Sequence, residues 1–389
     1  IFDGEAEQDT ASPQPPNSPS SDSTTQPSKT IEPKTDQNVR DINDANGDVP
    51  PAQRDVEPID NSTVRTLDVI TIIGNQEKLE RASGSAFKIS GKTLANQEHD
   101  DVHRVLKQVP GVYIRDEDGF GLRPNIGLRG ASSDRSAKVS LMEDGVLMAP
   151  APYAAPAAYY FPLTTRLNGM EVFKGPSAIK YGPNTIGGAL NFTTRPSIAR
   201  GSIGGIDLAM GSYGAQKVHV FFGQGISNFG YVLEGARIDS DGFKDLDNGA
   251  DTGFQKDDWM LKTHVQGSSG SGVFHRLELK VGLAREHSHE TYLGLTDADF
   301  EQTPYRRYAA SQLGDMNWER TQVKLQYHGL VGEDLEWNVT LYRHDFHRAW
   351  RKLNGFGSLS GVDIHDAVLD PTNPRFRPYV DLLKGASEW

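Results

Sequence analysis

The second half of the chain alternates apolar and polar residues with a period of two. Within each stretch the apolar residues would share one face of a strand. The pattern predicts long antiparallel strands with one apolar and one polar face, as in a large membrane β-barrel. A soluble sheet with one wet face gives the same pattern, so both architectures stay open at this point. The alternating stretches are 218–222, 259–266, 277–283, 322–328 and 335–341.

The connections between these stretches alternate between short and long. Outer-membrane barrels have short periplasmic turns and long extracellular loops, so the alternation favours the barrel and places the long connections outside. The turn at 211–214 belongs to the outer set but is short. Short turns are expected at 225–228, 267–272 and 329–334, and long connections at 240–256, 286–316 and from 346 onward.

Residues 84–200 have the mixed pattern of one compact α/β unit. A helix is predicted over 100–108, because Val102, Val105 and Leu106 recur at helical spacing. The dipeptide Pro110-Gly111 ends that helix. Short strands are predicted at 85–89, 112–115, 138–142 and 169–174.

The first 65 residues are rich in Pro, Ser, Gln, Thr, Asp and Asn. Such a segment cannot bury enough apolar surface to offset its chain entropy, so we expect a disordered tether rather than a coil packed on the fold. A β-branched patch at 67–74 follows. It is either an isolated strand that offers its backbone to a partner or the first strand of the next domain.

Composition and charge narrow the classes of function. The chain has no cysteine, which excludes disulfides, thiolate metal sites and a lipobox cysteine. Its net charge of −12 argues against nucleic acid as a partner. Its mean hydropathy is −0.54, and no run of 18 apolar residues exists, which excludes a transmembrane helix. The start at Ile1, without a basic and apolar leader, indicates a mature or excerpted protein.

Enzyme and metal motifs are weak. There is no G-x-S-x-G elbow, P-loop or H-E-x-x-H motif, so an enzyme is not expected. His287 and His289, with Glu286 and Glu290, have metal-competent side chains, but two histidines so spaced are usually a solvated loop. The acidic loop 239–251 lacks the spacing of a calcium-binding EF-hand. We therefore expect no metal site and no cofactor.

Six short motifs carry a family resemblance. Their order and spacing over about 120 residues resemble the plug signature of TonB-dependent outer-membrane transporters. They are 109–112 (VPGV), 126–130 (IGLRG), 142–146 (MEDGV), 172–176 (VFKGP), 181–182 (YG) and 187–191 (GGALN). Within that family, 116–125 (DEDGFGLRPN), 290–296 (ETYLGLT) and 304–308 (PYRRY) resemble the ferric dicitrate branch.

The resemblance implies a domain order and a fold. Residues 1–65 would be the tether, 66–75 the TonB-box segment, 76–200 the plug domain and 201–389 the N-terminal part of the barrel. The fold class is a membrane β-barrel of about 22 antiparallel strands when complete, enclosing an α/β plug domain. Only about seven strands precede Trp389, so we expect a truncated or excerpted chain.

The implied function is active import of an iron chelate across the Gram-negative outer membrane, with no bond made or broken in the substrate. Ferric dicitrate is the first expectation, another siderophore the second, and a bare transition metal such as zinc the third. The implied partners are TonB, with the ExbB-ExbD complex behind it, and outer-membrane lipid, and the protein would be a monomer. A passive porin and a soluble ligand-binding β-protein are the rival classes.

The resemblance also assigns candidate residues. Asp68, Val69, Ile70, Thr71 and Ile72 stand where the family carries its TonB box, which would pair edge to edge with a strand of TonB. The expected structural residues of the plug are Arg129, Lys174, Gly175, Gly187 and Gly188, with Arg129 buried and paired to acids of the barrel wall.

The ligand-binding candidates lie in the loops expected to face outward. Arg135 leads them, because a guanidinium presents a fork of donors to a carboxylate and keeps its charge. Tyr153, Tyr159 and Tyr160 would form an aromatic wall. Arg306 and Arg307 would complement an anionic chelate, with salt bridges inside the loop as the alternative.

Overall fold

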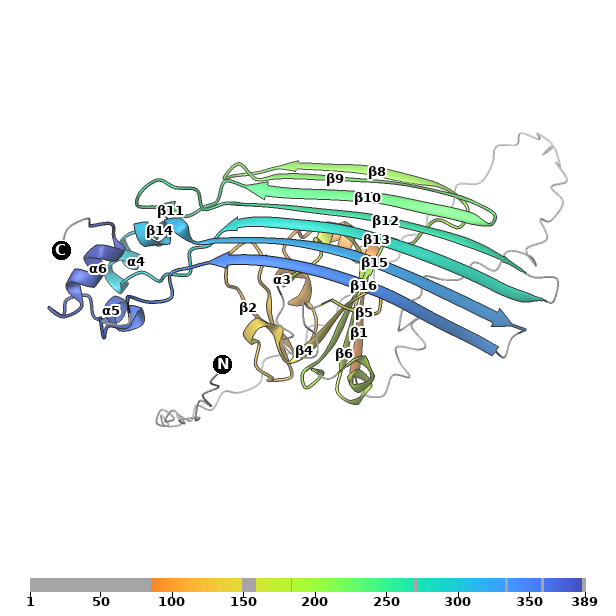
Figure 1. Cartoon of the computed structure of the whole chain (residues 1–389), viewed down its shortest axis with the longest axis horizontal. Coiled ribbons are helices and arrows are strands. Elements are labelled where there is room, and N and C mark those ends of the chain that lie inside the picture. The colour runs from red at the N-terminus through yellow and green to blue at the C-terminus, as the bar shows by residue number, and fades with distance from the viewer. Residues whose placement is uncertain are drawn as a thin grey trace, which may run out of the picture. The chain divides into compact units, whose positions relative to one another are not determined.

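The computed structural model describes residues 85–148, 159–182, 184–268, 272–332, 335–357 and 360–386. All of them lie in one structural unit, Asn61–Trp389. Two larger sheets dominate it, one of five strands and one of seven (Figure 1). None of the helices in the described part is long and apolar enough to span a membrane.

The described residues from 85 to 194 are built around the five-stranded sheet and are called the plug below. The strands of the plug are β1 (Ser85–Ser90), β2 (Val112–Arg115), β3 (Asn125–Leu128), β4 (Val139–Glu143), β5 (Val146–Leu147), β6 (Leu167–Lys174) and β7 (Gly188–Thr194). The sheet order is β1-β6-β7-β4-β5, with β4 parallel to β7 and the other neighbours antiparallel. β2 and β3 form a separate antiparallel pair.

All four strands predicted in this part are found, as β1, β2, β4 and β6. β3, β5 and β7 were not predicted. Every residue of β3 and β7 is buried, so neither strand has the polar face that produces alternation.

The helices of the plug are α2 (Gly91–Gln97) and α3 (Val102–Leu106), with 3-10 turns η2 (Asp134–Ser136), η3 (Thr164–Arg166) and η4 (Pro176–Tyr181). The helix predicted over 100–108 is present but shorter, because the carboxylate of Asp101 caps it by accepting from the backbone N–H of His103 at 2.8 Å. The chain turns at Gly111, whose φ is +77°.

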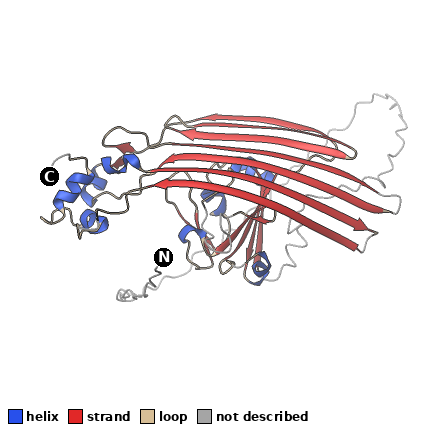
Figure 2. Ribbon diagram, viewed as in Figure 1, coloured by secondary structure: helices blue, strands red, loops and turns tan. Residues whose placement is uncertain are grey.

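The second half of the chain forms one antiparallel meander of seven long strands. They are β8 (Gly201–Met210), β9 (Gln216–Ile226), β10 (Phe229–Ser240), β12 (Phe254–Ser268), β13 (Val273–His289), β15 (Asp315–Val331) and β16 (Leu335–Arg351). Each strand pairs with the next in this order (Figure 2). The count of about seven strands is confirmed. In the described residues the sheet is open, with β8 and β16 at its edges.

The period-two prediction is confirmed by burial. Trp259 is 53% exposed, whereas the next residue, Met260, is 1% exposed. Leu283 and Leu341 also lie on the outer face, and Lys280 is buried on the inner face. The outer face is therefore apolar and the inner face largely polar, which is the reverse of a soluble sheet.

The two ends of the meander differ, as the alternating connections predicted. At the end called the loop end, long connections carry β11 (Asp245–Leu246), α4 (Asp297–Gln302), β14 (Arg306–Arg307), η5 (Ala309–Leu313), α5 (Ile364–Leu369) and α6 (Arg377–Leu383) (Figure 1). The other end, the turn end, has only short connections. The long connection expected from residue 346 was placed wrongly at its start, because β16 continues to Arg351.

The plug packs against the inner face of the meander. Leu128, Val172 and Phe192 of the plug belong to one buried apolar cluster with Met316 and Trp318 of β15. Trp318 is 1% exposed, so the plug and the meander share a core.

Candidate functional site

Six side chains gather between the plug and the last strand at the loop end. This cationic–aromatic cluster comprises Arg135, Tyr159, Tyr292, Arg348, Trp350 and Lys352. Two of them come from the plug, one from the connection after β13, and three from β16 or the residue after it. It therefore joins segments that lie far apart in the sequence.

Cations and rings alternate in the cluster. The guanidinium carbon of Arg348 lies 3.7 Å from the ring centre of Tyr159, and that of Arg135 lies 5.2 Å from the ring centre of Trp350. The ammonium of Lys352 lies 4.4 Å from Trp350, whose ring meets Tyr292 edge to face at 5.6 Å. Three cations share these rings, and such contacts hold positive charge in place without neutralising it.

Few acidic side chains balance the positive charge of the cluster in the described part of the chain. Arg135 Nη1 lies 3.0 Å from Glu117 Oε1. Burial lowers the pKa of Arg135, but Glu117 and Tyr292 outweigh it, so the pKa is raised and the charge is permanent. Within the described residues, Arg348 Nη1 and Trp350 Nε1 are buried and have no hydrogen-bond partner. Buried donors of this kind require an acceptor, and a ligand oxygen would supply one.

The backbone holds Arg135 in an unusual conformation. Its φ is +48°, and that of Ser136 is +56°. The Arg135 N–H donates to the side chain of Asn125 at 2.9 Å, and the Ser136 hydroxyl donates to the Pro124 carbonyl at 2.8 Å. Non-glycine residues adopt such angles only where the surroundings enforce them, and they gather at ligand-binding positions. The loop is thus preorganised.

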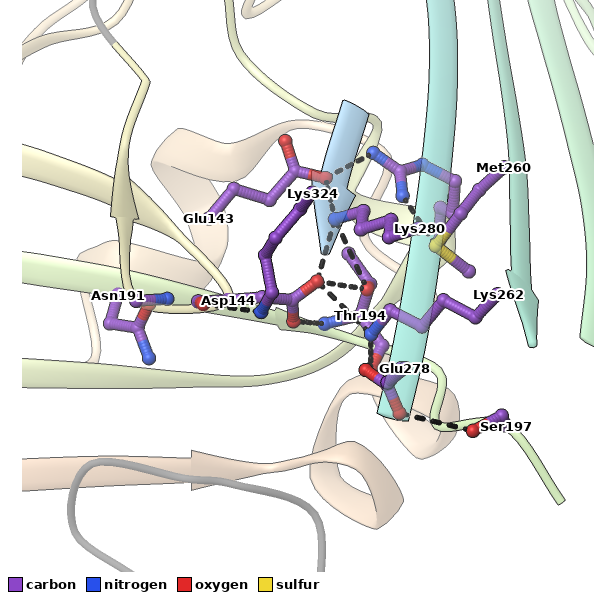
Figure 3. A network of polar contacts seen from close by, with 12 residues as sticks. Glu143, Asp144, Asn191, Thr194, Ser197, Met260, Lys262, Glu278, Lys280 and Lys324 are labelled. Carbon is purple, nitrogen blue, oxygen red and sulfur yellow. Dashed lines mark hydrogen bonds and ion pairs between the residues drawn. The ribbon is translucent and has the colours of Figure 1, made fainter. Parts of the chain in front are cut away.

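A buried ionic network connects the plug to the meander on the turn-end side of this cluster. Its centre is the turn between β4 and β5, where Asp144 and Gly145 have φ of +48° and +79°. An Asp-Gly pair with both φ positive is the two-residue turn that matches strand twist, so the hairpin projects Glu143 and Asp144 from its tip. Lys280 of β13 donates to both carboxylates, at 2.7 and 2.6 Å (Figure 3).

Further cations complete the charge balance of Glu143. Arg166 of the plug and Arg320 of β15 lie 3.0 and 3.1 Å from its carboxylate oxygens. Burial raises the pKa of Glu143, but Lys280, Arg166 and Arg320 outweigh burial and hold the pKa well below its usual value. The carboxylate is therefore ionised inside the protein.

A second ionic contact lies nearer the loop end. Arg123 of the plug donates to Glu286 at 2.6 Å, to Glu290 at 2.8 Å and to Ser288 at 2.8 Å. The carboxylate of Asp118 accepts from the backbone N–H groups that lead to Arg123, at 2.6 to 3.2 Å, which shapes the loop. This loop places the arginine against β13.

The expectation for Arg129 is wrong in its partners. Arg129 is exposed, and its positive φ of +54° lies in a turn. The buried arginines that pair with acids of the meander are Arg123 and Arg166, the latter 3.0 Å from Asp258 of β12. Lys174 is buried but donates to the Pro110 carbonyl at 2.7 Å rather than to an acid.

The predicted glycines lie in tight places. A Cβ at Gly188, where φ is +155°, would approach the Phe173 carbonyl oxygen at 2.3 Å. Gly175 has φ of +80° and lies against the Arg129 guanidinium, and Gly187 packs against Leu128. These contacts are compatible with the structural role expected of the three glycines.

Of the tyrosine candidates, Tyr159 belongs to the cationic–aromatic cluster and Tyr160 does not. Tyr160 is 1% exposed, and its hydroxyl donates to Glu143 at 3.2 Å inside the ionic network. Its expected place in an outward-facing wall is wrong, because successive residues of an extended chain point to opposite sides. Tyr153, and the segment Asp68–Ile72, lie outside the described residues.

Arg306 follows the alternative of salt bridges, although one of them reaches a second long connection, and Arg307 makes hydrogen bonds to backbone carbonyls instead. Arg306 lies 2.7 Å from both Asp247 and Asp299. Arg307 donates to the Pro304 carbonyl at 2.9 Å. β14 pairs in parallel with β11, so these arginines hold one long connection against another.

No described group of three or more His, Asp or Glu side chains is arranged to hold a metal ion. The rings of His287 and His289 meet edge to face, with their centres 4.8 Å apart, but the two side chains pair with different acids, Asp315 and Asp251. In the acidic loop 239–251, Asp239 pairs with Arg237 at 2.9 Å, and Asp247 with Arg306.

Sequence reasoning missed Arg348, Trp350 and Lys352, three members of the cationic–aromatic cluster. The available clue was alternation, because Phe346, Arg348 and Trp350 continue the period-two pattern of β16 past the point where a loop was expected. Arg123 was noticed only as part of a branch motif.

The fold and these contacts define a class of protein, a plug packed inside an antiparallel meander with an apolar outer face. Residues 78–189 match the family model described as TonB-dependent Receptor Plug Domain. This part of the chain therefore resembles the plug domain of TonB-dependent receptors. Members of this family reside in the Gram-negative outer membrane and are transporters rather than enzymes.

Curated relatives agree with this assignment. The chain is similar to the vitamin B12 transporter BtuB of Vibrio vulnificus, with 26% identity over 198 residues, which is 49% of this chain and 32% of the relative. It is also similar to an iron-regulated outer membrane virulence protein of Vibrio cholerae, with 28% identity over 134 residues, covering 33% of this chain and 20% of the relative. The chain thus spans about a third or less of these relatives.

A solved structure shares the fold. The chain is similar to the ferric citrate transporter FecA in its unliganded form, with a TM-score of 0.60 and 19% identity, over 72% of this chain and 43% of that one. At this identity the likeness concerns the fold alone. It supports the interpretation of the meander as part of a receptor barrel.

Proposed function

We propose that this protein imports an anionic metal chelate across the outer membrane, with TonB as the source of mechanical work. The observation that carries the proposal is the cationic–aromatic cluster at the junction of plug and loop end, whose three cations have one ion-paired acid, Glu117, among the described residues. A flat chelate with carboxylate oxygens matches both the rings and the unpartnered donors of Arg348 and Trp350.

Ferric dicitrate is the first candidate, since it is compact and anionic. Its carboxylates would accept from the unpartnered donors of Arg348 and Trp350. Another siderophore is the second candidate, and a bare transition metal the third. The relatives named as vitamin B12 transporters add a corrinoid as a further competitor, although a large uncharged ligand would leave the cations of the cluster uncompensated.

The coupling step is part of the same proposal. Asp68, Val69, Ile70, Thr71 and Ile72 would pair with a strand of TonB, and ExbB-ExbD would drive TonB from the inner membrane. The plug domain would close the barrel at rest. Binding at the loop end and exposure of this segment would then be two sites coupled through one plug.

The test is binding of ferric dicitrate to the receptor in detergent, measured by calorimetry, with Arg348→Gln as the variant. We expect micromolar or tighter binding that weakens about 10- to 100-fold in the variant, the loss of one charge-assisted contact to a carboxylate. Arg343→Gln is the matched control, because Arg343 lies on the same strand but is exposed and pairs only with Asp345 among the described residues.

Each result bears on a different part of the proposal. Binding that survives Arg348→Gln would move the site away from the cluster. Absence of ferric dicitrate binding, with binding of another siderophore, a corrinoid or zinc, would keep the transporter and replace its cargo. Loss of binding in Arg343→Gln as well would show that the effect of Arg348→Gln is not local.

A further inference from the structure

Three lysines form a cross-strand row on the inner face of the meander. Lys262 of β12 lies directly opposite Lys280 of β13, and Lys280 lies directly opposite Lys324 of β15. All three are at most 4% exposed. We call them the lysine row. Like charges directly opposite each other on neighbouring strands destabilise a sheet, so the row requires an anion.

The plug supplies that anion. Asp144 Oδ2 lies 3.0 Å from Lys262 and 2.6 Å from Lys280, and Lys324 donates to the backbone carbonyl of Asp144 at 3.0 Å (Figure 3). Glu143 adds one contact, 2.7 Å from Lys280. One hairpin tip therefore meets all three lysines.

The acids of the meander near the row are engaged elsewhere. Asp258 of β12 pairs with Arg166 at 3.0 Å, and Glu278 of β13 pairs with Arg276 at 3.1 Å. Arg320 lies on the same face of β15 as Lys324, four residues earlier. It adds another cation, which pairs with Glu143. Among the described residues, all the carboxylates within ion-pair distance of the row therefore belong to the plug.

Thr194 shows that the carboxylate of Asp144 occupies a shaped site. Its backbone N–H donates to Asp144 Oδ1 at 2.9 Å, and its hydroxyl donates to Oδ2 at 2.7 Å. With Lys262 and Lys280, four donors surround one carboxylate. Fixed donors around a carboxylate form an anion site whether the anion is a side chain or a free molecule.

We propose that the lysine row is an anion-binding site of the barrel wall, filled at rest by Asp144 and offered to the carboxylates of the cargo when the β4–β5 hairpin withdraws. The row lies near the middle of its strands, halfway between the loop end and the turn end. An anionic chelate moving along the wall would replace the lost counter-ion. We call binding of the cargo at the lysine row the relay role. It rests on the proposed import of an anionic chelate, whereas the anion site itself does not.

The first experiment empties the site and fills it with formate. Asp144→Gly removes the carboxylate, and glycine accepts the φ of +48° at this position. We expect the Tm of the receptor to fall and to recover saturably with formate, but not with formamide, because a ligand of the folded state stabilises it by mass action. Asp144→Asn is the control, since its amide fills the space and leaves no room for formate.

Equal effects of formate on the wild type and Asp144→Gly, or no effect on either, would overturn the anion site. The second experiment tests the relay with Lys324→Gln, which keeps both contacts of the Asp144 carboxylate to lysine. We expect uptake of ferric dicitrate by cells to fall several-fold in Vmax with unchanged affinity at the surface, and Lys324→Arg to retain the wild-type rate.

If the lysine row only holds the plug in place and does not bind the cargo, the expected change in Vmax has the opposite sign. Weaker plug contacts would leave Vmax unchanged or raise it, and either result would overturn the relay. If wild-type cells import no ferric dicitrate or other anionic chelate, the proposed function fails, and the formate measurement still decides whether the lysine row binds anions.

Discussion

Arg123 and Glu286 form an ion pair of 2.6 Å in which the arginine side chain is 1% exposed and the glutamate 0%. The two residues are 163 positions apart, one in a plug loop and one on β13. Because the pair is buried and also includes Glu290, removal of the arginine leaves two carboxylates without their shared partner. Breaking a buried pair is far costlier than breaking an exposed one.

Arg123→Gln should therefore lower the free energy of unfolding by about 3–5 kcal/mol, the usual cost of breaking a buried ion pair by removing one partner. Denaturant unfolding followed by tryptophan fluorescence measures it. Arg115→Gln is the control, because Arg115 and its partner Asp134 are 62% and 70% exposed, and the expected change is about 0–1 kcal/mol. Equal changes in the two variants would contradict the assigned importance of the buried pair.

Arg123 and Arg129 also show what the sequence could and could not predict. The alternating pattern and the connections predicted about seven strands, because neighbouring residues of a strand lie on opposite faces and differ in polarity. Which arginine points into the meander depends instead on turns, on Asp118 shaping one loop and on a positive φ at Arg129. Packing between distant segments determines which arginine is buried, so the local sequence pattern does not predict it.

The residues of the candidate site were predicted only in part for the same physical reason. Arg135 and Tyr159 were chosen for their chemistry and their loop, and both lie in the cationic–aromatic cluster. Arg348 and Trp350 were missed because their partners lie about 200 residues earlier in the chain. Contacts formed across a β-meander follow its register, which is known only once the strands are paired.

Gly188→Ala should destabilise the plug. A Cβ at this position would approach the Phe173 carbonyl oxygen at 2.3 Å, and backbone atoms of two paired strands cannot move apart without breaking the ladder. We expect a loss of about 2–4 kcal/mol, from backbone strain and overpacking together. Thermal unfolding of the receptor measures it.

Gly130→Ala separates strain from overpacking. Gly130 has φ of +80°, but a Cβ there has nothing within 4 Å. The expected loss is about 1–2 kcal/mol, the cost of the left-handed conformation alone. A Gly188→Ala variant no less stable than Gly130→Ala would show that the clash is relieved at no cost.

Asp299 predicts an acid-sensitive contact between the long connections. Burial raises the pKa of Asp299, but hydrogen bonds from Lys384, Tyr308 and Thr296 outweigh burial and lower the pKa from 3.8 to about 2. Because the folded-state pKa is depressed, the carboxylate stabilises this contact above pH 3.8 and loses that contribution as the pH falls toward 2.

Limited pepsin digestion checks this window. Cleavage within 297–313 should increase as the pH falls from 4 to 2 in the wild type, beyond the change in cleavage elsewhere in the chain. Asp299→Asn should be cleaved readily at every pH, because its amide cannot hold Lys384 or Arg306 as an anion does. A pH profile shared by the wild type and the variant would contradict the assignment.

Trp350 predicts how the cationic–aromatic cluster recognises a flat anionic ligand. Its ring lies 5.2 Å from Arg135, 5.5 Å from Arg348 and 4.4 Å from Lys352, so it sets the spacing of three charges. Trp350→Leu keeps an apolar side chain but removes the ring and its N–H. We expect ferric dicitrate to bind about 5- to 30-fold more weakly, which corresponds to about 1–2 kcal/mol.

Trp337→Leu is the matched control, since Trp337 lies at the turn end of the same strand and packs on Tyr327. Calorimetric titration of both variants, with circular dichroism to confirm the barrel, separates the local effect from a general one. Weaker binding in both variants would indicate a loosened β16. Unchanged binding in Trp350→Leu would mean that the ligand rests on the cations without the ring, and the aromatic part of the proposed recognition would be wrong.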